Sequence, residues 1–280
     1  MKQIIFFSFI FLLLCSCNKE IEYQHEDSVK ARTTNPLNYF GDSHNSRMDY
    51  IQNMSGFDTA SVHTIFTYST NYSDTYFNSY TGDWMKHIET IDICTDIANN
   101  TIDPSDALLK DSIITLSMKK YVKKIDSLFD NSINFSSQTI KTSSQFTNEI
   151  ESIEALIMNE YPCTISANGV GDEGAFLLGA CAIAKKSFDY WAQVTSDSTD
   201  SWNIKLNSIT SLPTDLQQNQ IEVRDVPKWL KKAWRGVKVA AVDVWGFMTA
   251  KGCAWDDANG HHYDLFCAWD YAGEKSSSIP

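Results

Sequence analysis

The sequence predicts an all-α fold, an irregular helical domain that ends in a short turn or hairpin. Three observations lead to this prediction. Apolar residues recur with a period of about 3.6 residues over most of the chain after residue 42, which is the pattern of amphipathic helices. Capping residues and prolines stand where these periodic segments begin. Glycine or clusters of polar residues follow where the segments end.

The first expected helix begins near residue 42. Asp42 or Ser43 can cap it, and His44, Met48 and Ile51 share one helical face. Five further helices are expected, over residues 84–97, 107–130, 142–160, 172–194 and 227–251.

The borders of these helices follow known preferences. Pro227 begins the last helix and Gly252 follows it, in agreement with the preference for proline at the start of a helix and glycine after its end. The segments 133–145 and 195–220 are rich in Ser, Thr and Asn, and we expect loops there.

The N-terminal residues have the features of an exported protein. Lys2 precedes an apolar run from residue 4 to residue 14, which is too short to cross a bilayer core of about 30 Å. The run ends in Leu14-Cys15-Ser16-Cys17, which resembles the lipobox of bacterial lipoproteins. The resemblance implies that residues 1–16 are a signal peptide and that Cys17 is acylated, with palmitate among its acyl chains. An ordinary signal peptide that is cut nearby is the alternative.

The resemblance also implies a location and a division into domains. Asn18-Lys19-Glu20 is similar to the start of Bacteroidota lipoproteins that are exported to the cell surface. We therefore expect an extracytoplasmic protein that lipid anchors to the outer membrane, facing either the periplasm or the cell surface. Residues 17–40 are polar and aperiodic and are expected to form a flexible tether. Residues 41–280 are expected to form a single, mostly helical domain.

The charge balance excludes one class of partner. The chain has 35 acidic and 23 basic residues and a formal net charge of −12. Binding to nucleic acid requires a net basic face that displaces counterions, so we expect no nucleic-acid partner.

A glycine-rich motif, Gly169-Val170-Gly171-Asp172-Glu173-Gly174, matches the dinucleotide-binding fingerprint in form. No buried strand is expected before it, and two acids stand where phosphates would bind. We therefore expect a turn whose acids cap the following helix, and neither a nucleotide nor another cofactor.

The last expected helix carries a carboxylate among small residues. Gly236, Ala240 and Gly246 lie close to one line with Asp243 in the middle, so another helix can pack closely against them. A buried carboxylate needs a partner, and the candidate is His44, which lies on the apolar face of its own helix. The pair has two interpretations: the general-base dyad of a hydrolase, or a satisfied pair in the core.

The segment His44-Asn45-Ser46-Arg47-Met48-Asp49-Tyr50-Ile51 resembles the opening of a group of uncharacterised bacterial proteins with the pattern His-Asn-x-x-Leu-Asp-Tyr-Ile. The helix of Asp243 and the helix end Ser187-Phe188-Asp189-Tyr190-Trp191 belong to the same resemblance. Met48 departs from this pattern, and Trp245-Gly246 departs from the Gly-Ala run of the group. The resemblance implies no known activity.

The same last helix begins with a basic face that is interleaved with tryptophans. Its cations are Lys228, Lys231, Lys232, Arg235 and Lys238. A face of this kind can touch anionic lipid or sugar, which makes a membrane-active protein that uses the helix 227–251 an alternative function. The other interpretation is a solvated face that pairs with acids of the same chain.

The segment from Cys253 to Asp270 contains Cys-Ala-Trp-Asp twice. Outside the cytoplasm, Cys253 and Cys267 are expected to form a disulfide around a turn at Asn259-Gly260. A loop centred on Gly260 would place the two cysteines opposite each other, whereas a two-residue hairpin would place Cys253 opposite Phe266. At least one of the remaining cysteines is expected to be a buried free thiol, from the set Cys94, Cys163 and Cys181.

Two metal sites are alternatives for the same segment. Adjacent residues of a strand point to opposite faces, which makes a zinc site difficult to assemble. Its candidate ligands are Cys253, His261, His262 and Cys267. A calcium site would depart from the spacing of a twelve-residue calcium loop. Its candidate ligands are Asp256, Asp257, Asn259 and Asp264.

These features predict a membrane-tethered lipoprotein that binds a protein or glycan partner through its helical domain. The first alternative is a hydrolase or metal-dependent enzyme that uses His44 and Asp243. The second is a membrane-active protein that uses the helix 227–251.

Overall fold

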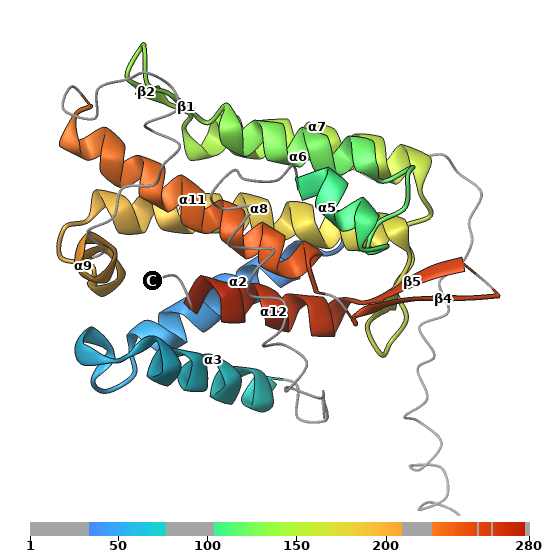
Figure 1. Ribbon diagram of the computed structural model, residues 1–280, viewed down its shortest axis with the longest axis horizontal. Coiled ribbons are helices and arrows are strands. Elements are labelled where there is room, and N and C mark those ends of the chain that lie inside the picture. Colours follow the sequence, from blue (N-terminus) through green and yellow to red (C-terminus); the bar gives the residue numbers. More distant parts are fainter. Residues whose placement is uncertain (1–33, 77–103, 209–225, 251, 259, 278–280) are drawn as a thin grey trace, which may run out of the picture. The chain divides into compact units, whose positions relative to one another are not determined.

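The computed structural model describes residues 34–76, 104–208, 226–250, 252–258 and 260–277, all of which belong to one unit, Arg32–Pro280 (Figure 1). Within these ranges the protein is predominantly helical, with nine α-helices that hold 66% of the residues. Five short strands accompany the helices. The all-α prediction is therefore correct for the main architecture and incomplete for the small sheets.

Nine α-helices and one 3₁₀ turn lie within the described ranges. They are α2 (Asn38–Gln52), η1 (Phe57–Thr59, a 3₁₀ turn), α3 (Val62–Tyr76), α5 (Pro104–Lys110), α6 (Lys119–Asp130), α7 (Ser143–Glu160), α8 (Glu173–Ser196), α9 (Ser201–Ser208), α11 (Lys228–Met248) and α12 (Leu265–Ser277).

Helix α8 forms the centre of the fold. Of its 24 residues, 17 are buried, and many of them are Ala or Gly. It packs against α2, α7 and α11, and α11 packs in turn against α12 (Figure 1). A Cβ atom added to Gly236 of α11 would lie 2.9 Å from the carbonyl oxygen of Trp191 in α8. The predicted close packing of a neighbouring helix at Gly236 is thus confirmed.

Two long helices begin where the sequence indicates. Thr142 accepts a hydrogen bond from the backbone of Gln145, and the Gln145 side chain accepts one from the backbone of Thr142, which completes a capping box for α7. Asp172 accepts a hydrogen bond from the backbone N–H of Ala175 at 2.8 Å and caps α8.

The single helix expected over residues 107–130 is two helices, α5 and α6. Ser112 has a φ of 57°, a left-handed conformation that a continuing α-helix does not accommodate. The residues that follow turn Ile113 and Ile114 into the core and leave Leu116 75% exposed. The prediction of one helix is wrong because apolar residues continue with helical spacing across the break.

Other departures concern short elements. Helices α3 and α12 were not expected, and α9 lies inside the segment 195–220 that we expected to be a loop. Asn35, Leu37 and Phe40 are buried, so the packed fold includes residues that we assigned to the tether. The helix expected over 84–97 lies outside the described residues.

The strands form two small antiparallel sheets. β1 (Ile133–Asn134) pairs with β2 (Thr139–Ile140). The other sheet has the order β3-β5-β4, with β3 (Val170–Gly171), β4 (Ala254–Asp257) and β5 (Gly260–Asp264). In Figure 1 the β4–β5 hairpin projects beyond the helices.

Among the described residues, no helix is both long and apolar enough to cross a membrane.

Candidate functional site

The structure brings His44 and Asp243 together, as the sequence predicts. His44 lies on α2 and Asp243 on α11, and the distance from His44 Nε2 to Asp243 Oδ2 is 3.7 Å. Both side chains are fully buried. The pair therefore connects two helices inside the core.

Two further residues, both on α8, complete this cluster. Ser187 Oγ donates a hydrogen bond to Asp243 Oδ2, and Trp191 Nε1 donates one to the same oxygen at 2.8 Å. Ser187 and Trp191 are spaced by four positions, so they lie one above the other on one face of the helix. We call His44, Ser187, Trp191 and Asp243 the buried cluster. Sequence reasoning named neither Ser187 nor Trp191 as a partner, although this spacing was a readable signal.

The buried cluster has the residue types of a hydrolase but a different arrangement. In a serine triad the imidazole lies between the hydroxyl and the carboxylate. Here Ser187 donates directly to Asp243, and the carboxylate is the common centre of the contacts. Ser187 and Trp191 are at most 1% exposed, so solvent does not reach the hydroxyl group.

Burial also sets the protonation of the histidine. Desolvation lowers the pKa of His44 below its usual value, and the nearby carboxylate of Asp243 opposes this shift only in part. The imidazole therefore favours its neutral form in the folded protein.

A second buried cluster joins the start of the described chain to α7 and α8. Asn35 Nδ2 donates to Glu154 Oε1 at 2.6 Å, and Lys185 Nζ donates to Glu154 Oε2 at 2.9 Å. Burial raises the pKa of Glu154, and these two hydrogen bonds oppose the shift. The ion pair satisfies charges that would otherwise be costly in the core.

A third buried contact, an ion pair, joins α2 to α12. Arg47 Nη1 lies 3.0 Å from Asp270 Oδ1, and the guanidinium carbon lies 5.1 Å from the centre of the Trp269 ring. Ser73 of α3 also donates a hydrogen bond to Asp270. Arg47 is fully buried, so its charge depends on this carboxylate.

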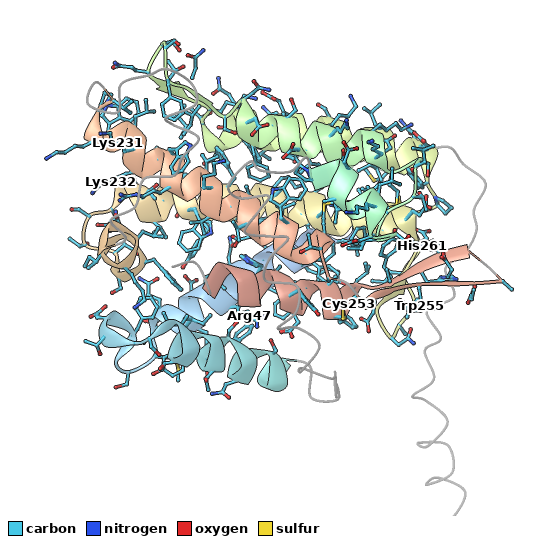
Figure 2. All side chains as sticks on the ribbon, viewed as in Figure 1. Arg47, Lys231, Lys232, Cys253, Trp255 and His261 are labelled. Carbon is cyan, nitrogen blue, oxygen red and sulfur yellow. A yellow bond between two sulfur atoms is a disulfide. The ribbon has the colours of Figure 1, made fainter. Side chains whose placement is uncertain are left out.

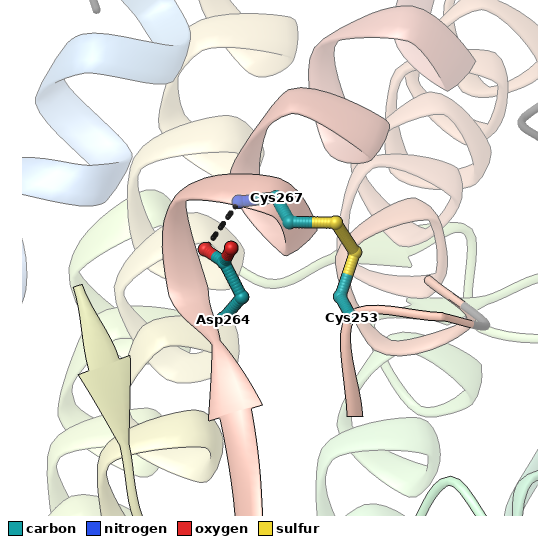
Figure 3. The surroundings of a disulfide bond; sticks show 3 residues. All are labelled: Cys253, Asp264 and Cys267. Atoms are coloured by element: carbon teal, nitrogen blue, oxygen red, sulfur yellow. Dashed lines mark hydrogen bonds between the residues drawn. A yellow bond between two sulfur atoms is a disulfide. The ribbon is translucent and has the colours of Figure 1, made fainter. Parts of the chain in front are cut away.

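The predicted disulfide between Cys253 and Cys267 is present, with the two Cα atoms 5.7 Å apart (Figure 3). The expected register is wrong. Asp257 pairs with Gly260, which places Cys253 just before the strand ladder, and Cys267 lies in the first turn of α12. The bond is possible because the chain changes from strand to helix at Leu265, which turns Cys267 back towards Cys253. Asp264 accepts a hydrogen bond from the Cys267 N–H at 3.0 Å at this corner.

This bond excludes the zinc alternative, because neither Cys253 nor Cys267 has a thiolate to offer. Cys181, by contrast, is a buried free cysteine, as expected for one of the remaining thiols. Burial raises its pKa well above the usual value. Cys163 is also buried and is not part of the disulfide, whereas Cys17 and Cys94 lie outside the described residues.

The hairpin histidines bind different carboxylates. His261 Nδ1 contacts Asp256, and His262 Nε2 lies 3.0 Å from Asp257 Oδ1. Asp256 and Asp257 are adjacent in a strand and point to opposite faces. Asp264 caps α12 instead of joining them, and Asn259 lies outside the described residues. Within the ranges that the structure describes, no three His, Cys, Asp or Glu side chains are placed to hold a metal ion.

The glycine-rich motif forms the expected turn. Asp172 Oδ2 accepts hydrogen bonds from the backbone and the hydroxyl group of Thr164, and its Oδ1 caps α8. Gly169 has a φ of 84°, and a Cβ atom there would collide with the Phe266 ring. The glycine thus allows the turn to pack against Phe266 at the start of α12.

Comparison with known proteins adds no relative to this description. No protein-family model matches the chain, and no curated protein or solved structure does either.

Proposed function

We propose that the chain is a lipid-anchored, extracytoplasmic protein whose helical domain binds a protein or glycan partner. The anchor is the acylated Cys17, and the sequence Leu14-Cys15-Ser16-Cys17 supports it. The location is the outer membrane, on its periplasmic or external side.

The disulfide is the observation that carries this proposal. Cys253 and Cys267 are both buried, and the bond ties the β4–β5 hairpin to α12. Structural disulfides form in oxidising compartments and are rare in the cytosol. The bond therefore agrees with the export that the N-terminal residues indicate.

The hairpin is the best candidate for the binding surface. Trp255 is 41% exposed, and its ring centre lies 5.8 Å from that of His262. His262 is held by Asp257, so an aromatic face and a polar pair lie together on one side of the hairpin. Figure 2 shows Trp255 on the strand that projects from the helices. Exposed tryptophans with polar neighbours are typical of interaction sites.

The buried cluster supports binding over hydrolysis. A general base must come within hydrogen-bond reach of its substrate, and His44 and Asp243 have no exposed surface. The hydrolase alternative requires the cluster to open. The hydrolase alternative predicts that the wild type hydrolyses a substrate and that His44→Gln abolishes this activity although the variant remains folded.

The anchor is tested on protein purified from membranes of the native host. Intact-mass measurement should find a chain that begins at Cys17 and carries acyl chains. The variant Cys17→Ala should lose the acyl mass and leave the membrane fraction. A native N-terminus that is neither cut nor acylated would contradict the proposal.

The location is tested by adding a protease to intact cells and to cells with a permeabilised outer membrane. Cleavage in intact cells would indicate an external position, and cleavage only after the outer membrane is permeabilised would indicate a periplasmic position. A chain protected in both samples would overturn the extracytoplasmic assignment.

A further inference from the structure

We propose that the first turns of α11 lie on the anionic phospholipid surface of the membrane that carries the anchor. The contact surface consists of Lys228, Trp229, Lys231 and Lys232, which we call the basic face. This inference rests on the proposed function for the anchor and adds a second contact with the same membrane.

The basic face is continuous on the helix. Lys228, Lys231 and Lys232 follow the spacing i, i+3 and i+4, so their side chains share one side. Trp229 lies beside them and is 52% exposed. Figure 2 shows Lys231 and Lys232 at the end of α11 that is remote from Trp255. The face is thus separate from the hairpin surface.

The basic face has no anionic counterpart in the described part of the chain. Lys228, Lys231 and Lys232 make no ion pair there, whereas Lys120 pairs with Glu160 and Lys186 with Asp42. No acidic residue lies in the first turn of α11, and no side chain caps it. The N-terminus of a helix carries a partial positive charge, which adds to that of the lysines. An anionic surface would offset this concentration of charge.

The side-chain types favour a membrane surface as the source of the negative charge. Lysine stems lie along the apolar boundary while the ammonium groups reach the phosphates, and tryptophan is enriched at the same depth. From Val239 onward almost every residue of α11 is buried in the protein. The helix can therefore rest its first turns on the membrane without inserting its full length.

The length of chain before the described residues permits this contact. Seventeen positions separate Cys17 from Thr34, and a chain of this length spans at most about 60 Å when fully extended. A lipid at Cys17 would hold the domain near the bilayer and give a weak surface contact a high effective concentration.

The test uses the complete chain purified from membranes and placed on vesicles with about 30% anionic phospholipid or with zwitterionic phospholipid alone. Bromine-labelled acyl chains quench tryptophans that lie near the bilayer, and the difference between the wild type and Trp229→Phe isolates Trp229. We expect quenching of Trp229 on anionic vesicles only, and its loss at high salt, which screens charges.

Two matched variants separate this contact from general charge effects. Lys228, Lys231 and Lys232 all changed to Gln should abolish the quenching, and Lys110, Lys123 and Lys124 changed to Gln should retain it. Near-ultraviolet circular dichroism verifies that each variant is folded. Equal quenching in both variants, or no quenching in the wild type, overturns the inference even where mass measurement finds the acyl chains.

If the purified chain carries no acyl group, the proposed anchor is contradicted. The same protein is then mixed with vesicles in solution. The fraction that sediments with anionic vesicles then tests the basic face alone. Each lysine near an anionic surface contributes about a fivefold increase in binding, so the triple Gln variant should bind on the order of a hundredfold more weakly. A change of less than about threefold would overturn the inference.

Discussion

The two copies of Cys-Ala-Trp-Asp have the same residues but differ in secondary structure and in the exposure of their tryptophans. In the first, Cys253 lies just before strand β4 and Ala254 to Asp256 belong to it, and its tryptophan is 41% exposed. The second, Cys267 to Asp270, forms the first turns of α12, and its tryptophan is fully buried. The disulfide joins the two copies at their cysteines.

The surroundings explain this difference. Trp269 donates a hydrogen bond from Nε1 to the carbonyl oxygen of Phe40 at 3.0 Å, and Asp270 holds the buried Arg47. Trp255 and Asp256 instead face the histidines of the neighbouring strand. A segment of four residues therefore takes the structure that its tertiary contacts stabilise, and its own preference is too weak to decide.

The largest contrast is expected between the two tryptophans. Trp269→Ala removes a fully buried ring, its hydrogen bond and its contact with Arg47, and should lower the free energy of unfolding by about 3 to 5 kcal/mol. Trp255→Ala removes a ring that already meets solvent and should cost less than about 1 kcal/mol. Urea unfolding at neutral pH measures both. Equal losses would mean that the hairpin packs more tightly than its exposure indicates.

The two aspartates should differ almost as much. Asp270→Ala leaves the guanidinium group of Arg47 buried without its carboxylate and should destabilise the protein by about 3 kcal/mol or more. Asp256→Ala breaks a pair whose carboxylate is 76% exposed, and we expect less than about 1 kcal/mol. A loss below about 1 kcal/mol for Asp270→Ala would argue against the ion pair with Arg47.

The disulfide joins the two copies, and its removal should allow them to separate. The double variant Cys253→Ala/Cys267→Ala removes a link across 14 positions, which corresponds to about 3 kcal/mol of chain entropy. A reductant should lower the melting temperature of the wild type and leave that of the double variant unchanged. If the reductant lowers the melting temperature of both proteins equally, the disulfide does not account for the decrease.

The α12 copy also shows why part of the fold could not be predicted. Helix α12 continues directly from strand β5, and its capping residue Asp264 is itself the last residue of that strand, so no loop separates the two elements and marks a new helix. The start of α7 was predictable because Thr142 and Gln145 form a capping box from local residues alone. Ser112 breaks the helix 107–130 through a backbone conformation that serine rarely adopts, and no local signal indicates it.

The buried cluster could be predicted from the sequence only in part. Asp243 stood out because a carboxylate among small residues on an apolar face requires a partner. His44 was the most attractive candidate because it lies on an apolar face of its own helix, and the structure brings the two together. Ser187 and Trp191 were not named as partners, because their spacing of four positions shows that they share one face of α8 and does not show which residue that face meets. Their role depends on how α8 and α11 cross, which the sequence of either helix does not determine.

The burial of His44 should also make the stability of the protein depend on pH. Burial lowers the pKa of His44 in the folded protein, so the unfolded chain binds more protons between that pKa and the ordinary value of 6.5. Stability from this group is complete above pH 6.5 and is lost as the pH falls below it, with a slope of at most about 1.4 kcal/mol per pH unit. His44→Gln removes the titrating group and should flatten the urea midpoints between pH 6.5 and pH 5, at a lower overall stability. A variant that keeps the slope of the wild type would place the acid sensitivity at another group.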